Sequence, residues 1–402
     1  MARTAGVDWA SEAHEVCVVE GSEVICREEV PHDERGLDFL CRRLVGLEVE
    51  GVAIERPEGV LVERLLAAGL CVMAIHPNQV KAARSRYAVA HGKSDRFDAF
   101  VLAELARTDA HRFRALVPDS DLTKALRALT RAREDAVGVR IELANQLRAQ
   151  LEAFWPGAAR VFGDVDSKIG LAFLRRYPSP ADARRLGERR MAAFLAREGY
   201  SGGKSAGELI ARLRSAPLGD AGEAELCARR AVVLGLVDAL APLVCQIAEL
   251  TRRIRAALAE HPDREIFAPL FRGEGTAVCP ATLIAEIGDV RERYPTEASL
   301  AADAGQSPVA VESGKRRVAV FRRACDKRLR GAMAILANST RQWHPWAQDI
   351  YRRARERGAD HPHAIRILGR AWVRVLWRCW ADEVPYDPAL HGGLCRLQPS
   401  GG

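Results

Sequence analysis

The sequence lacks the cysteine spacings that mark disulfide frameworks and structural zinc sites. Its 10 cysteines are scattered along 402 residues, and no two of them stand in a Cys-x-x-Cys arrangement. Neither a disulfide-stapled secreted domain nor a zinc ribbon is therefore expected. We expect a cytoplasmic protein with reduced thiols.

Three further signals are missing. No apolar run approaches the roughly 18 residues that cross a bilayer, so no membrane association is expected. The N-terminus has no basic patch followed by an apolar stretch, so no secretory signal is expected. No Gly-x-Gly-x-x-Gly follows the first predicted strand, so a dinucleotide-binding domain has no support.

Charge is distributed unevenly along the chain, although its net value is only +7. Residues 1–60 carry 6 basic and 14 acidic side chains, whereas residues 301–402 carry 18 basic and 9 acidic ones. An acidic head and a basic tail indicate metal binding at one end and contact with a polyanion at the other. The alternative is ordinary solvated surface.

The N-terminal part, residues 1–118, predicts a mixed α/β sheet. Three β-type runs with short gaps come first and predict an antiparallel meander: residues 5–9, 13–20 and 23–30. Helical patterns then alternate with buried strands: helices at 33–45, 58–68 and 94–106, strands at 51–55 and 71–75. This order is that of the ribonuclease-H-like fold.

Two long helical patterns dominate the middle part, residues 119–262. Apolar residues form a seam of 4- and 3-residue steps in residues 121–154, and a second seam runs from Val233 to Leu258 with a kink expected at Pro242. Both seams are narrow with charged flanks, which favours a coiled-coil arm, with an irregular insertion near 156–222. Two core helices of one bundle are the alternative. Residues 263–402 predict a mainly helical C-terminal domain.

Four carboxylates stand where this sheet brings them together. Asp8 ends the first strand, Glu55 ends the fourth, and Asp95 and Asp98 begin the last helix. Neighbouring carboxylates repel, so such a cluster predicts a bound divalent cation, and oxygen ligands favour Mg²⁺ or Mn²⁺. Taken singly, each acid has a simpler explanation as a turn former or as a partner of the helix dipole.

In these local contexts the set Asp8, Glu55, Asp95 and Asp98 resembles the DEDD transposases of insertion sequences, whose N-terminal domain is similar to the Holliday-junction resolvase RuvC. The resemblance continues along nearly the whole chain. Residues 122–129 look like the family's entry into its arm, residues 272–288 like its helix–turn–helix segment, and residues 304–314 like its serine-bearing loop.

The resemblance implies that Ser313 attacks DNA and forms a covalent phosphoserine, acting beside the metal-bound carboxylates. Locally, Ser313 is also consistent with a turn residue beside a DNA-contacting basic loop. The residues that follow it are candidates to bind nucleic acid: Lys315, Arg316, Arg317, Arg322, Arg323, Lys327 and Arg328.

The predicted function is that of a transposase that cuts and rejoins DNA to insert and excise a mobile element. The resemblance implies double-stranded donor and target DNA, a structured noncoding guide RNA, and a homo-oligomer that assembles from dimer to tetramer on nucleic acid. Two alternatives remain. One is a metal-dependent Holliday-junction-type resolvase in which water attacks, and the other is a non-catalytic nucleic-acid-binding scaffold.

Overall fold

The computed structural model describes residues 2–87, 94–217, 219, 221–272, 277–313 and 316–395. By its internal contacts the chain divides into two units, residues 1–119 and residues 120–402. Gly273, Glu274 and Gly275, which belong to the predicted helix–turn–helix segment, lie outside the described residues.

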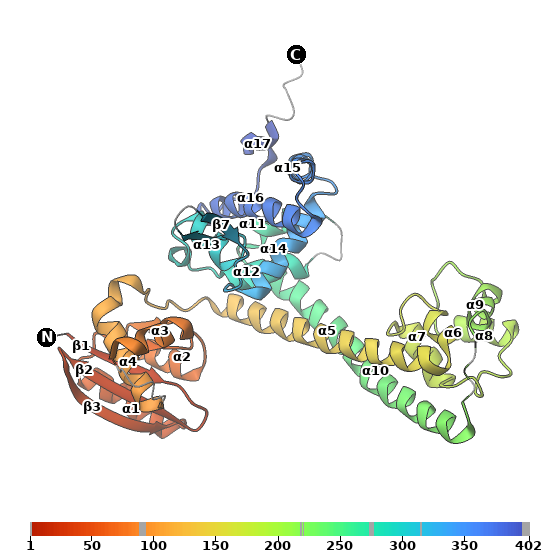
Figure 1. Ribbon diagram of the computed structural model, residues 1–402, viewed down its shortest axis with the longest axis horizontal. Helices are drawn as coiled ribbons and strands as arrows, with labels where there is room; N and C mark the ends of the chain where they lie inside the picture. Colours follow the sequence, from red (N-terminus) through yellow and green to blue (C-terminus); the bar gives the residue numbers. More distant parts are fainter. Residues whose placement is uncertain are drawn as a thin grey trace, which may run out of the picture. The chain divides into compact units, whose positions relative to one another are not determined.

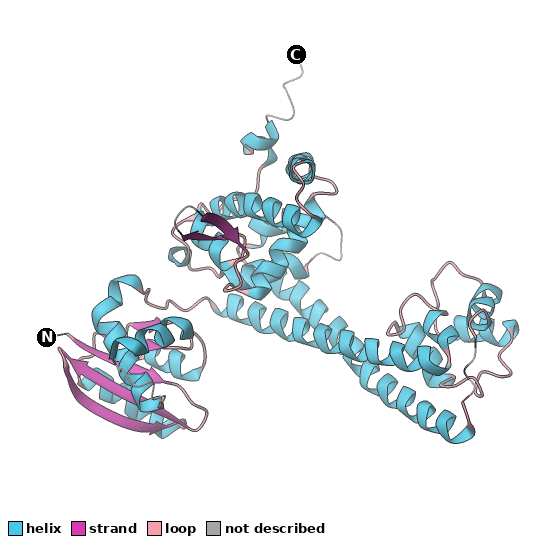
Figure 2. Cartoon of the chain, in the orientation of Figure 1, coloured by secondary structure: helices cyan, strands magenta, loops and turns pink. Residues whose placement is uncertain are grey.

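The first unit is an α/β domain built on a five-stranded sheet (Figures 1 and 2). Its strands are β1 Arg3–Asp8, β2 Ala13–Glu20, β3 Glu23–Pro31, β4 Gly51–Ile54 and β5 Val72–Ala74. Its helices are α1 Glu34–Gly46, α2 Val60–Ala67, α3 Pro77–Tyr87 and α4 Asp95–Asp109, followed by the short η1 Ala110–Arg112. The predicted elements are confirmed, and α3 is a helix that the sequence analysis missed.

The strand order is β3-β2-β1-β4-β5. Strands β1, β2 and β3 form an antiparallel meander, while β4 and β5 run parallel to β1. Helices α1 and α2 pack on one face through residues such as Leu40 and Leu65. Helices α3 and α4 cover the other face through Val80 and Leu102. Because both faces are covered, the central strands β1 and β4 are apolar along most of their length.

The second unit begins with a long helix, α5 Asp121–Phe154, which packs along α10 Glu223–Glu260 (Figure 1). The apolar seam of α10 is buried, and the helix continues through Pro242. By length and composition α10 also passes as a membrane-crossing helix, so the expectation that no apolar run is long enough was wrong. Val237 and Ile254 of its seam are buried within the protein.

The segment between the long helices is helical, not irregular as the sequence predicted. It holds α6 Pro156–Arg160, α7 Lys168–Arg176, α8 Glu188–Arg197 and α9 Ala206–Arg214. Their apolar faces form one core with Leu147, Leu151 and Phe154 of α5. Short helices joined by Gly and Pro escaped detection because each offers only two or three turns of periodicity.

The C-terminal part is mainly helical. Its helices are α11 Arg264–Phe267, α12 Val278–Ile287, α13 Glu297–Asp303, α14 Lys327–Thr340, α15 Pro345–Glu356, α16 His361–Ala381 and α17 Gly392–Cys395. Short 3-10 turns lie at η2 Ala268–Leu270, η3 Arg291–Arg293 and η4 Pro388–Leu390. One hairpin interrupts the helices, β6 Val309–Ser313 and β7 Arg316–Val320. The sequence analysis expected only a loop and a basic stretch there.

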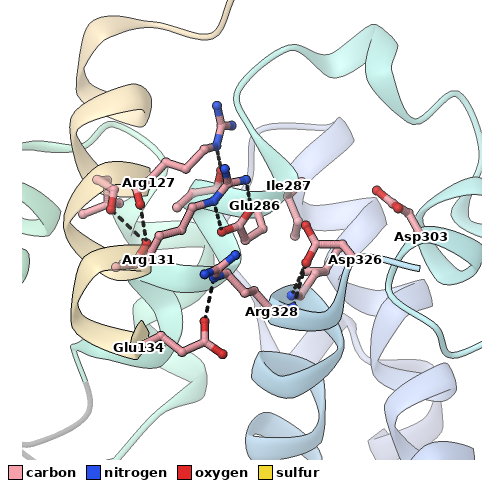
Figure 3. A network of polar contacts seen from close by, with 12 residues as sticks. Arg127, Arg131, Glu134, Glu286, Ile287, Asp303, Asp326 and Arg328 are labelled. Carbon is pink, nitrogen blue, oxygen red and sulfur yellow. Dashed lines mark hydrogen bonds and ion pairs between the residues drawn. The ribbon is translucent and has the colours of Figure 1, made fainter. Parts of the chain in front are cut away.

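A polar network joins α5 to this C-terminal part (Figure 3). Arg131 of α5 makes a bidentate ion pair with Glu286 of α12, with distances of 3.0 and 2.7 Å, and the Glu286 side chain is only 1% exposed. Arg127 donates to the carbonyl of Ala285 at 2.7 Å. Removing one partner would leave a buried charge without compensation, which lowers stability. This pair therefore fixes the position of α5 against α12.

The last segment of the chain is fastened by a histidine pair. Buried His344 lies 2.9 Å from the hydroxyl of Tyr386, and that hydroxyl lies 2.7 Å from Nδ1 of His391. Burial, followed by the nearby His391 and Arg272, lowers the pKa of His344 from the ordinary 6.5 to about 4. Burial also lowers the pKa of His391.

We predict that this segment loses stability in mild acid. The unfolded chain binds a proton at His344 below about pH 6.5, whereas the folded chain binds it only near pH 4. Stability is therefore full above pH 6.5 and falls by about 2 kcal/mol at pH 5. Urea unfolding followed by tryptophan fluorescence measures it, since five of the seven tryptophans lie between residues 343 and 380.

The comparison variant is His344→Gln, whose unfolding should depend less on pH between 7.5 and 5. Exposed His363→Gln serves as the control and should retain the wild-type dependence. An unchanged pH dependence in His344→Gln would contradict the assignment.

Candidate functional site

Asp8 and Glu55 follow the last paired residues of two neighbouring parallel strands. Val7 of β1 pairs with Ile54 of β4, so the two acids come next in register. Side chains alternate along a strand, so Asp8 shares the face of Gly6, and Glu55 shares that of Ala53. Gly6 and Ala53 both face the α3–α4 side of the sheet, as their contacts with α4 and its core cluster show. Both carboxylates therefore belong to that face.

Helix α4 lies unusually close to β1. The hydroxyl of Thr4 donates to the carbonyl of Ala103 at 3.0 Å, and a Cβ at Gly6 would lie 2.0 Å from the carbonyl oxygen of Ala99. Only glycine permits this approach. Moving from Thr4 to Gly6 shifts the contact by one turn toward the start of α4. From this progression we expect the next step to place Asp8 level with Asp95.

The two acids of α4 lie in different surroundings. Ser94 caps the helix by accepting a hydrogen bond from the amide of Phe97 at 3.2 Å, and Asp95 beside it is exposed. Asp98 is 3% exposed and is held by Arg84 of α3, which donates to both carboxylate oxygens at 2.5 Å. The guanidinium supplies the positive charge that a buried carboxylate requires.

In this structure the four acids do not form a ligand group. Among the described residues, no three or more His, Cys, Asp or Glu side chains are placed so as to hold a metal ion. Two arginines were missed by the sequence analysis. One is Arg84. The other is Arg56, which follows Glu55 in the chain, and its guanidinium carbon lies 4.0 Å from the ring centre of Trp9, which follows Asp8. Arg84 carried no signal because α3 was not predicted.

Ser313 lies at the end of β6, where the hairpin turns back. It pairs with Arg316 of β7, and Glu312 pairs with Arg317. Every residue of β6 is exposed, and the hairpin also presents Val311 and Val318 to solvent. The serine thus lies on an exposed two-stranded element.

The basic candidates differ in how accessible they are. Lys315 lies outside the described residues, and of Arg316 and Arg317 only the backbone is described. Arg323 and Lys327 are exposed, and no carboxylate of the described chain pairs with them. Arg322 donates to the carbonyl of Ser307 at 3.0 Å.

Arg328 is already held in ion pairs with α5. It forms ion pairs with Glu134 at 2.9 Å and Asp135 at 2.7 Å, both on α5 (Figure 3). Binding a phosphate through Arg328 would compete with these contacts. In the described part of the chain, Arg323 and Lys327 have no such ion pairs to lose.

Two family models match the sequence. A transposase model covers residues 5–156, and a model for transposases of the IS116/IS110/IS902 family covers residues 273–352. The first contains the four carboxylates, and the second contains Ser313 and its hairpin.

Curated relatives extend over most of the chain. A mini-circle protein of Streptomyces coelicolor, named as the transposase for IS117, is 31% identical over 95% of this chain and 94% of its own length. An uncharacterised 42 kDa protein of insertion element IS900 from Mycobacterium paratuberculosis is 28% identical over 96% of this chain and 97% of its own.

Among solved structures, T. thermophilus RuvC in complex with a Holliday junction substrate is 20% identical and aligns with a TM-score of 0.24. It covers 29% of this chain and 100% of that protein. At this score the match carries no argument. The family models and the relatives named above agree, and this chain belongs to the IS110/IS116 family of DEDD transposases.

Proposed function

We propose that this transposase breaks and rejoins DNA through Ser313, with a divalent cation held by Asp8, Glu55, Asp95 and Asp98. The position of Ser313 carries the proposal, because an exposed serine at the end of a surface hairpin strand can reach the backbone of a bound strand. In the reaction, the serine hydroxyl gives up its proton as its oxygen bonds to phosphorus, the bond to the leaving sugar oxygen breaks, and that oxygen takes up a proton, so that no net proton is consumed.

The first unit supports the metal part of the proposal. Its strand order and the placement of its acids correspond to a ribonuclease-H-like domain, and the donors at this corner are carboxylates alone, which suit Mg²⁺ or Mn²⁺. A divalent ion there would bind phosphate oxygens and stabilise their developing charge. Since Arg84 occupies both oxygens of Asp98, the ion must take over the role of the guanidinium.

The remaining assignments follow from the family. We infer a cytoplasmic enzyme that binds donor and target DNA together with a structured noncoding RNA, and that assembles from dimers to tetramers on nucleic acid. We also infer that α5 and α10 form a coiled-coil arm. The chain would then have three domains, at residues 1–118, 119–262 and 263–402. The exposed Arg323 and Lys327 support contact with the nucleic-acid backbone.

Arg84→Gln tests the metal site without measuring activity. Removing the internal cation should tighten Mn²⁺ binding about tenfold and should lower the stability of the metal-free protein by about 3 kcal/mol, because Asp98 stays buried without a partner. Mn²⁺ titration by electron paramagnetic resonance and urea unfolding give the two values.

Arg86→Gln is the matched control, since Arg86 lies two residues away and is 58% exposed, with an ion-pair distance of 3.5 Å to Asp109. It should leave both values unchanged. Weaker Mn²⁺ binding in Arg84→Gln, or equal binding, would remove Asp98 from the proposed ligand set.

Ser313→Ala should abolish a covalent protein–DNA adduct while DNA binding persists. The adduct is detected by denaturing gel electrophoresis, after incubation with end-labelled DNA of the element and target and with RNA from the element's noncoding end. Ser85→Ala, an exposed serine of α3, should form the adduct normally. Strand cleavage by the wild type without any adduct would favour a resolvase that uses water.

A complementation experiment tests whether one site draws on two chains. The carboxylates and Ser313 belong to different units, so we expect a composite site with acids from one protomer and serine from another. A mixture of Asp98→Asn and Ser313→Ala chains should then recover part of the strand transfer that each variant lacks. No recovery in confirmed mixed oligomers would place the site within a single chain.

A further inference from the structure

A cavity of about 380 Å³ lies at the base of the Ser313 hairpin. Its walls come from residues 305–308, from the end of β7 with Phe321 and Arg322, and from the first turns of α16. The volume falls within the range of small-ligand sites. All the residues that line it belong to the second unit, whereas the four carboxylates belong to the first.

The cavity wall is cationic and aromatic. It contains Arg322, Arg366 and Arg370 and no aspartate or glutamate. Glu297 pairs with Arg370 from outside the wall, whereas among the described residues no carboxylate pairs with Arg366. The unbalanced positive charge favours an anionic occupant.

Phe321 provides a surface for stacking. Its side chain is 46% exposed, which is unusual for a phenylalanine, and the guanidinium carbons of Arg330 and Arg366 each lie 5.2 Å from its ring centre. Aromatic rings and guanidinium planes are the two side-chain surfaces on which proteins stack nucleobases.

The floor holds an amide whose hydrogen bonds are incomplete. Gln306 is 5% exposed, its Nε2 donates to the carbonyl of Ala304 at 3.2 Å, and its Oε1 has no hydrogen-bond partner among the described residues. A Cβ at Gly369 of α16 would lie 2.5 Å from this oxygen, so glycine there makes room for the amide. A buried acceptor without a partner is unfavourable in a finished core.

The cavity also lies near the proposed nucleophile. Val320, which lines it, pairs with Val309, four residues before Ser313 on the same strand. Four residues of β-strand span about 13 Å, the length of a few nucleotides. A strand attacked at Ser313 would therefore pass the mouth of the cavity.

We propose that this cavity receives an unpaired nucleobase of the strand bound at the Ser313 hairpin. The base stacks on Phe321 and Arg366, and a neighbouring phosphate lies against Arg322. A base can enter only where the duplex is open, so the pocket selects a locally unpaired strand. This inference rests on the proposed function, because that function brings a DNA strand to the hairpin.

The test separates recognition of the base from attraction to the phosphates. Two fluorescein-labelled single-stranded 20-mers serve as probes, one with natural bases and one fully abasic, and anisotropy titration gives both dissociation constants. Phe321→Leu should weaken binding of the natural strand about tenfold, as expected for loss of one stacked base, and should change the abasic strand less than twofold. Arg366→Gln should weaken both strands.

Phe39→Leu is the matched control, since Phe39 of α1 is 47% exposed but lies in the other unit. It should change neither value. Equal effects of Phe321→Leu on both strands, or no effect on either, would overturn the pocket. Normal adduct formation at Ser313 in that case would leave the proposed function standing. If the wild type bound the natural strand through its bases but formed no adduct at Ser313, the proposed function alone would be overturned.

Discussion

The close approach of α4 to β1 is the contact on which the candidate metal site depends. At Gly6 a single added carbon would lie 2.0 Å from a backbone oxygen of the helix, so the distance between sheet and helix requires glycine. The approach places α4, which carries Asp95 and Asp98, against β1, which ends at Asp8. A larger residue at position 6 would push α4 outward and separate the acids of the helix from those of the sheet.

Burying Asp98 under α4 creates an electrostatic demand that Arg84 meets. A carboxylate that is 3% exposed is stable only with a cation beside it, and the bidentate guanidinium is that cation. The same demand explains how the corner could exchange one cation for another. A metal ion that bound there would replace the guanidinium of Arg84. Its affinity for Asp98 would have to exceed that of the guanidinium.

Ion pairs elsewhere determine which of the many arginines are available to nucleic acid. Arg131 and Arg328 join α5 to the C-terminal part, and Arg370 is tied to Glu297 of α13. Among the described residues, Arg323 and Arg366 pair with no carboxylate; Arg366 lines the cavity and Arg323 follows the hairpin in the chain. Net charge does not distinguish the arginines held in ion pairs from those without a carboxylate partner. Both groups carry the same charge, and their members are often close together in the sequence.

The sequence by itself determined the order of the strands and of α1, α2 and α4 in the first unit, the two long helices and the family. These features depend on local periodicity and on short motifs, which are legible without contacts. The tertiary structure alone decided that Arg84 neutralises Asp98, that Arg328 pairs with acids of α5, and that Phe321 lines a cavity at the base of the serine hairpin. Each of these depends on residues far apart in the chain or on an element that the sequence patterns did not predict, such as α3 or the β6–β7 hairpin. Side-chain pairing is decided by where packed elements bring charges together, and one-dimensional spacing does not contain that information.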